Sequence, residues 1–96
     1  MSDQMMRYWL ARKDNTSKYT TTIEFVHDTA HERVLINLRK YDSREDLWEW
    51  MDSEWKFGNK SVHAGTWLTP AEGKLVWNHS LQEGFTRIDS VEVLRR

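Results

Sequence analysis

The first 40 residues have the pattern of strands: two segments rich in aromatic or β-branched residues are followed by one in which hydrophobic and polar side chains alternate. The third segment is the clearest case, because Val34, Ile36 and Leu38 fall on one side of a strand and the residues between them on the other. The three segments are 5–13, 18–27 and 32–40, with turn residues between them at 14–17 and 28–30. The pattern predicts a three-stranded antiparallel meander over residues 5–40, after a frayed start at 1–4.

The next segment, residues 43–57, has the spacing of an amphipathic helix. Leu47, Trp48, Met51 and Trp55 fall on one side at about 100° per residue, and Ser43 is a suitable N-cap. The helix would end at Gly58 and Asn59, where positive φ is tolerated. Trp50 and Phe57 lie off the hydrophobic stripe, so we expect them to be partly exposed beside an acidic face. Residues 43–57 contain five acidic and two basic residues.

The segment 58–96 allows two interpretations of its middle part. Thr69-Pro70-Ala71-Glu72 is a capping box with proline at the first helical position, which predicts a second helix to about Gln82, ended by Gly84. The alternative is a hairpin with its turn at Ala71-Glu72-Gly73, because the hydrophobic residues do not form one clean helical stripe. We favour the helix. Residues 85–96 predict a last strand with an irregularity near Asp89-Ser90.

Together these elements predict an α+β fold in one domain over residues 1–96. The expected architecture is an antiparallel sheet, made of the N-terminal meander and a C-terminal strand, packed against one helix and a second helix or hairpin, in the order βββα(α)β. A length of 96 residues suits a single core.

Composition narrows the classes of function. The chain has no cysteine, no apolar run long enough to span a membrane and no signal-peptide pattern, so we expect a cytoplasmic protein without a membrane partner. No nucleophile elbow, phosphate loop, dinucleotide fingerprint or zincin motif is present. The sequence therefore predicts neither a cofactor nor a catalytic residue, and it favours a binding protein over an enzyme.

Histidines and carboxylates gather in one short stretch. His27, Asp28 and His31 lie within five residues and could provide ligands for a divalent metal, which would suit a small metal-dependent hydrolase. A turn between two strands usually exposes such groups to water instead. We therefore expect a polar turn and keep the metal site as the third hypothesis.

Six tryptophans in 96 residues are unusual for one small core. Exposed aromatic residues often anchor a protein partner, and the acidic helix would carry several of them. Our main hypothesis is therefore a small regulator, adaptor or phage-type inhibitor that binds a protein partner. The candidate contact residues are Trp50, Phe57, Glu49, Ser53 and Trp67.

The polar face of the meander supports an alternative hypothesis, in which the chain binds nucleic acid. Its candidate residues are Arg33, Asn37, Arg39, Thr20 and Thr22. Three strands followed directly by a Trp-containing helix, over residues 7–50, resemble the layout of the arm-type DNA-binding modules of phage and transposon integrases. That resemblance implies insertion of the sheet into the major groove. The net charge of −1 and the presence of Glu24 on this face count against it.

Overall fold

The computed structural model describes residues 5–14, 18–91 and 94, and the expected frayed start at residues 1–4 lies outside them. It contains eight strands and one helix in the described residues. The elements are β1 (Met5–Lys13), β2 (Tyr19–Asp28), β3 (Arg33–Asp42), β4 (Leu47–Met51), β5 (Glu54–Phe57), β6 (Lys60–His63), β7 (Trp67–Leu68), α1 (Pro70–Gln82) and β8 (Thr86–Ile88).

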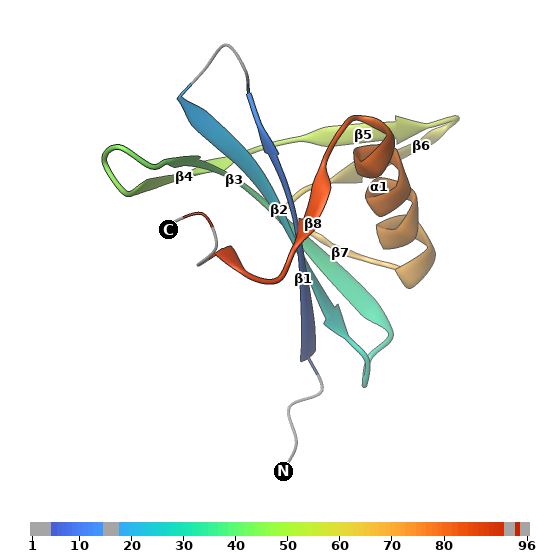
Figure 1. Cartoon of the computed structure of the whole chain (residues 1–96). Coiled ribbons are helices and arrows are strands. Elements are labelled where there is room, and N and C mark those ends of the chain that lie inside the picture. Colours follow the sequence, from blue (N-terminus) through green and yellow to red (C-terminus); the bar gives the residue numbers. More distant parts are fainter. Residues whose placement is uncertain (1–4, 15–17, 92–93, 95–96) are drawn as a thin grey trace.

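An antiparallel sheet in the order β4-β3-β2-β1-β8 forms the body of the molecule, and β7 pairs with the same edge of β3 as β4 does (Figure 1). The predicted meander is confirmed, because β1 pairs with β2 and β2 with β3 over their whole lengths. The last strand is also present, although it pairs with β1 only over Thr86–Ile88. The α+β class and the packing of this sheet against a helix are confirmed.

The inner face of the sheet carries the hydrophobic core. Leu10, Ile23, Phe25, Ile36 and their neighbours pack under α1 and under a separate hairpin formed by β5 and β6. No helix in the described part of the chain is long and apolar enough to cross a membrane.

The helix predicted at 70–82 is confirmed, together with its capping box. The Thr69 hydroxyl accepts a hydrogen bond from the Glu72 N–H at 3.2 Å, and the Glu72 carboxylate accepts one from the Thr69 N–H at 2.8 Å. Gly84 follows the helix with φ of 93°, a conformation that glycine adopts at low cost. Gly73, Val76 and Ser80 are the buried positions of α1, and the partly buried Trp77 packs beside them against the core.

The helix predicted over residues 43–57 is wrong. The chain turns at 43–46 and returns as β4, which pairs with residues 38–42 of β3. The turn is closed locally: the Arg44 N–H donates to the Asp42 carboxylate at 3.0 Å, the Tyr41 hydroxyl donates to Asp46 at 3.0 Å, and Asp46 has φ of 48°. Asx turns of this kind compete with the first turn of a helix.

The segment after β4 is a β-hairpin and not the end of a helix. In β5 and β6, Phe57 pairs with Lys60 across a two-residue loop, Gly58-Asn59. Gly58 has φ of 65°, as a type II′ hairpin turn requires at its first position. The resemblance to integrase arm modules is lost with this correction, because a fourth strand replaces the helix that should follow the third.

Candidate interaction surface

The outer face of the sheet, on the side away from α1, collects an unusual set of side chains. Strand alternation and register place four tryptophans there, contributed by three different strands. The β3 strand lies between β2 on one side and β4 and β7 on the other, and it contributes alternate residues to this face. Its outer-face residues are Arg33, Leu35, Asn37, Arg39 and Tyr41.

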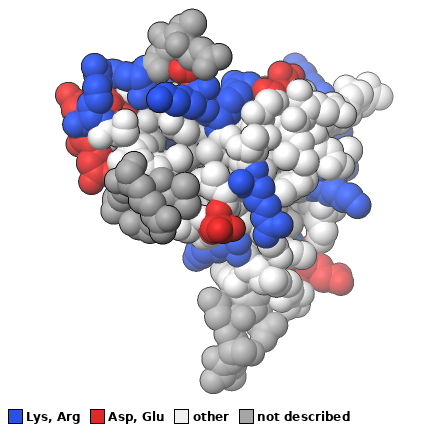
Figure 2. Space-filling view, in the orientation of Figure 1, with Lys and Arg blue, Asp and Glu red and all other residues white. Residues whose placement is uncertain are grey.

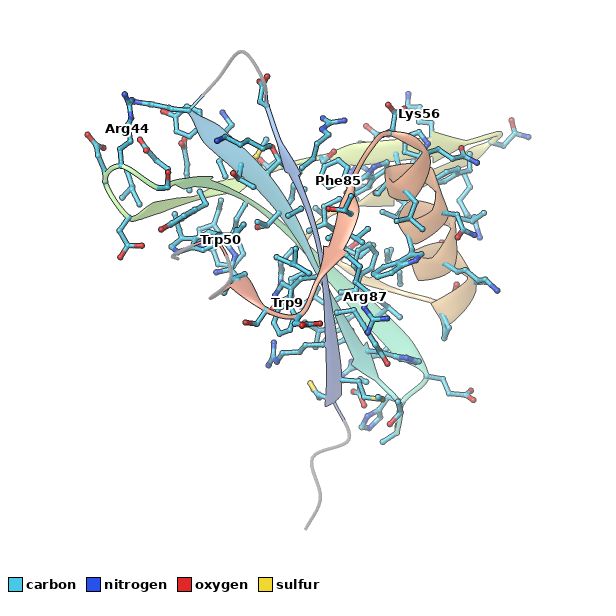
Figure 3. All side chains as sticks on the ribbon, in the orientation of Figure 1. Trp9, Arg44, Trp50, Lys56, Phe85 and Arg87 are labelled. Atoms are coloured by element: carbon cyan, nitrogen blue, oxygen red, sulfur yellow. The ribbon has the colours of Figure 1, made fainter. Side chains whose placement is uncertain are left out.

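One group of aromatic rings surrounds Arg39. Trp50 lies directly opposite Arg39 in the β3–β4 register, and the guanidinium carbon is 4.6 Å from the centre of the Trp50 ring and 5.4 Å from that of Trp48. Trp48 packs on Tyr41 with 4.5 Å between ring centres. Trp50 is nevertheless 67% exposed, so the arginine holds the ring in place without covering it. Figure 3 places Trp50 on β4, across the picture from α1.

A second group lies farther along β3. The guanidinium carbon of Arg33 is 3.9 Å from the centre of the Trp67 ring, and Trp67 is 42% exposed. Trp67 pairs with Leu35, and Trp50 with Arg39, so the two exposed tryptophans are four β3 residues apart, about 13 Å at the usual rise of a strand. We call Arg33, Arg39, Trp48, Trp50 and Trp67 the Trp–Arg surface.

Carboxylates beneath this surface hold its arginines in position. Glu24, 8% exposed, accepts from Asn37 at 3.0 Å and lies 3.6 Å from Arg39 and 3.4 Å from Arg7. Pairs between a buried carboxylate and partly exposed arginines fix side-chain geometry and leave little unbalanced charge at the surface.

Asp28 holds Arg33 in position in the same way, through a hydrogen-bonded ion pair. It is 3% exposed and accepts hydrogen bonds from Arg33 Nε at 3.0 Å and from the His31 N–H at 3.3 Å, with the His31 ring 2.9 Å away. Burial raises the pKa of Asp28, but the hydrogen bonds from Arg33 and His31 outweigh it and hold that pKa below its ordinary value.

The five protein-binding candidates do not lie together, because the helix that was expected to join them is absent. Trp50 and Trp67 share the outer face, whereas Phe57 packs against the inner core with its ring 5.9 Å from that of His79. Ser53 lines a cleft beside His79, and Glu49 is exposed on the inner side of β4. Of the candidate set, only Trp50 and Trp67 belong to one surface.

The five nucleic-acid-binding candidates do share one face. Thr20, Thr22, Arg33, Asn37 and Arg39 all lie on the outer side of β2 and β3. Thr22 is only 3% exposed, and Arg33 and Arg39 each have a carboxylate partner within 3.6 Å. The arrangement that the alternation predicted is therefore present, with less free charge than a phosphate-binding surface needs.

The histidine stretch is divided between the two faces. His27 lies on the inner side of β2 and lines a cleft, whereas the neighbouring Asp28 lies on the outer side and binds Arg33 and His31. Among the residues that the structure describes, no three histidine, cysteine or acidic side chains come close enough to hold a metal ion. The proposed ligand set of His27, Asp28 and His31 is not assembled.

Comparison of the chain with models of protein families, with curated protein sequences and with solved structures gave no match.

Sequence reasoning missed the Arg39–Trp50 and Arg33–Trp67 pairs, because they depend on β4 and β7 pairing with β3. One signal was available. Trp50 and Phe57 did not fit the helical stripe, and Trp48-Glu49-Trp50 and Trp55-Lys56-Phe57 alternate with the period of a strand.

Proposed function

We propose that this chain is a small interaction module that docks a protein partner on the Trp–Arg surface. The observation that carries the proposal is that two exposed tryptophans stand on one sheet face, each held by a stacked arginine whose charge is balanced by a buried carboxylate. Tryptophan and arginine are the residues most enriched at the centres of protein interfaces. The cytoplasmic setting expected from the sequence is part of this proposal.

Preorganisation supports the same conclusion. A side chain that is free in solution loses rotamer entropy when it binds, at about 0.5–1.5 kcal/mol for each flexible side chain. Trp50 and Trp67 each pack against a guanidinium that is itself hydrogen-bonded or paired below. Their rings are therefore partly ordered before any partner arrives, while their outer faces stay in solvent.

Charge favours a protein over a nucleic acid as the partner. Three arginines of the outer face, Arg7, Arg33 and Arg39, lie over two carboxylates, those of Glu24 and Asp28. Figure 2 shows basic and acidic side chains interspersed on the side of the molecule in view (Figure 2). Binding that releases many counterions requires an excess of positive charge that this surface does not supply.

The test compares two double variants in a capture experiment from cell lysate treated with nuclease. Trp50→Ala/Trp67→Ala removes both anchors, and Leu75→Ala/Leu81→Ala removes two exposed apolar side chains, 41% and 43% exposed, from α1 on the other side of the sheet. We expect the wild type and the α1 variant to retain the same protein, and the tryptophan variant to lose it. Equal capture by all three chains contradicts the proposal.

Stability must be measured on the same variants. Trp50→Ala removes an exposed ring and its contact with Arg39, so we expect a loss of less than about 1 kcal/mol. Trp77→Ala, which removes a ring packed against Phe25 at 5.1 Å, serves as the core reference with an expected loss of about 3 kcal/mol or more. A loss for Trp50→Ala as large as that for Trp77→Ala assigns Trp50 to the core.

A second candidate function rests on the same face, since Arg33, Asn37 and Arg39 stand beside aromatic rings on which bases could stack. Anisotropy of a labelled pyrimidine-rich single strand at low salt distinguishes the two. Nucleic-acid binding predicts a complex whose salt slope falls by about one unit in Arg33→Gln. The protein-docking proposal predicts no complex.

A further inference from the structure

A cleft on the inner face, remote from the Trp–Arg surface, has the composition of a small-molecule site. It lies between α1 and strands β1–β3 and has a volume of about 270 Å³, close to the lower end of the roughly 300–1,000 Å³ typical of ligand pockets. Its lining includes the buried Phe25 and Val34, the half-buried Tyr8 and Trp77, and the exposed Lys74 and Arg87.

The aromatic walls of the cleft are fixed by their own contacts. The Trp77 ring meets the Phe25 ring at 5.1 Å and 70°, and the Tyr8 ring at 6.3 Å and 81°. These edge-to-face contacts are the arrangement that aromatic rings prefer. A planar apolar group that enters the cleft therefore meets three rings that are already in place.

The first turns of α1 pack closely on the sheet at one end of the cleft. Gly73 faces the sheet, and a Cβ atom at that position would come within 3.1 Å of a Val34 methyl. Position 73 therefore carries no side chain between α1 and Val34. Pro70 and Gly73 both line the cleft and add neither a charge nor a side-chain hydrogen-bond donor.

Charge at the rim has one sign only. The lining includes Lys74, Arg87 and His27 but no acidic residue. Arg87, on β8, pairs with Leu10 of β1, and its guanidinium carbon is 5.6 Å from the centre of the Tyr8 ring. Figure 3 shows the Arg87 side chain between β8 and α1 (Figure 3). Over residues 5–14, 18–91 and 94, neither Lys74 nor Arg87 forms an ion pair, in contrast to Arg33 and Arg39 on the outer face.

We propose that this cleft binds a small aromatic carboxylate, with the ring among Tyr8, Phe25 and Trp77 and the carboxylate at Arg87 and Lys74. The guanidinium group matches a carboxylate with two parallel hydrogen bonds, and the ammonium group adds a second positive charge. The cleft is mostly apolar, so a planar ring with a single charge fits it better than a multiply charged phosphate. This site is independent of the outer face and of the function proposed for it.

The test uses naphthalene-2-carboxylate as the probe and naphthalene-2-carboxamide as its uncharged match. Binding is followed by titration of ¹⁵N-labelled protein, with the Trp77 indole signal assigned from Trp77→Phe. We expect the carboxylate to shift the Trp77 signal and to bind about a hundredfold more tightly than the carboxamide, as two charge-assisted contacts worth about tenfold each predict.

Variants locate the site. Arg87→Gln and Lys74→Gln should each weaken the carboxylate about tenfold and leave the carboxamide unchanged, whereas Lys56→Gln, an exposed cation on β5 outside the cleft, should have no effect. The amide spectrum of each variant reports whether the fold is intact. The proposal is overturned by no binding at millimolar probe, by equal affinity for the two probes, or by binding that Arg87→Gln does not weaken.

Discussion

A methyl group added at Gly73 should weaken the packing of α1 on the sheet and lower the stability of the protein. A Cβ atom there would lie 3.1 and 3.3 Å from the two Val34 methyl carbons and 3.2 Å from the Val34 Cβ. Carbon atoms in favourable contact are about 3.5–4.0 Å apart. Rotation of Val34 cannot relieve all three contacts, and its strand is held on both sides, by His27 and by Leu68.

The expected magnitude is a balance of two effects. Overpacking of this kind costs about 1–3 kcal/mol, and alanine is favoured over glycine within a helix by about 1 kcal/mol. We therefore expect Gly73→Ala to destabilise the protein by about 1 kcal/mol, a fall in Tm of about 4–8 °C for a chain of this size. Thermal and urea denaturation at neutral pH measure it directly.

The same substitution in a Val34→Ala background tests the cause. With both Val34 methyl groups removed, two of the three close contacts disappear and the helix can settle, so Gly73→Ala should be neutral or stabilising there. The coupling energy between the two positions should be about 1 kcal/mol. A Gly73→Ala effect of the same sign and size in both backgrounds would falsify the proposed contact between α1 and β3.

Two further predictions concern the cap and an outer-face carboxylate. Thr69→Ala removes the oxygen that accepts the Glu72 N–H and should cost about 1 kcal/mol, read as a lower urea midpoint with an unchanged slope. Asp28→Asn should be less stable than the wild type at neutral pH, because a carboxylate with a lowered pKa stabilises the fold while it is charged. That difference should shrink as pH falls below the ordinary value of 3.8, whereas a pH-independent difference contradicts the Asp28–Arg33–His31 arrangement.

Local patterns were sufficient for the meander and for α1. Aromatic and β-branched content between turn residues indicates the first two strands, alternation with a period of two indicates the third, and the capping box at Thr69–Glu72 is a signal within four residues. Residues 43–57 satisfy two periods at once, since Leu47, Trp48, Met51 and Trp55 also fit a helix. The segment forms a strand because it pairs with the edge of β3, and a local sequence pattern cannot show whether that edge is available.

Part of the candidate site could likewise be predicted from local patterns, and part could not. The polar residues of β3 were correctly placed on one face, because alternation alone fixes which residues of a strand point together. Their pairing with Trp50 and Trp67 could not be predicted, because it requires the register of two later strands on β3. The inner cleft was missed for the same reason, since its residues come from β1, β2, β3, α1 and β8.

The most direct test of the docking proposal is the spectrum of the six tryptophan indole groups with and without the captured partner. The proposal predicts that the Trp50 and Trp67 signals shift or broaden on binding, while those of Trp55 and Trp77, which pack against the inner core, stay in place. Partner binding that leaves Trp50 and Trp67 unchanged and moves Trp55 or Trp77 instead would show that the outer face is not the interface.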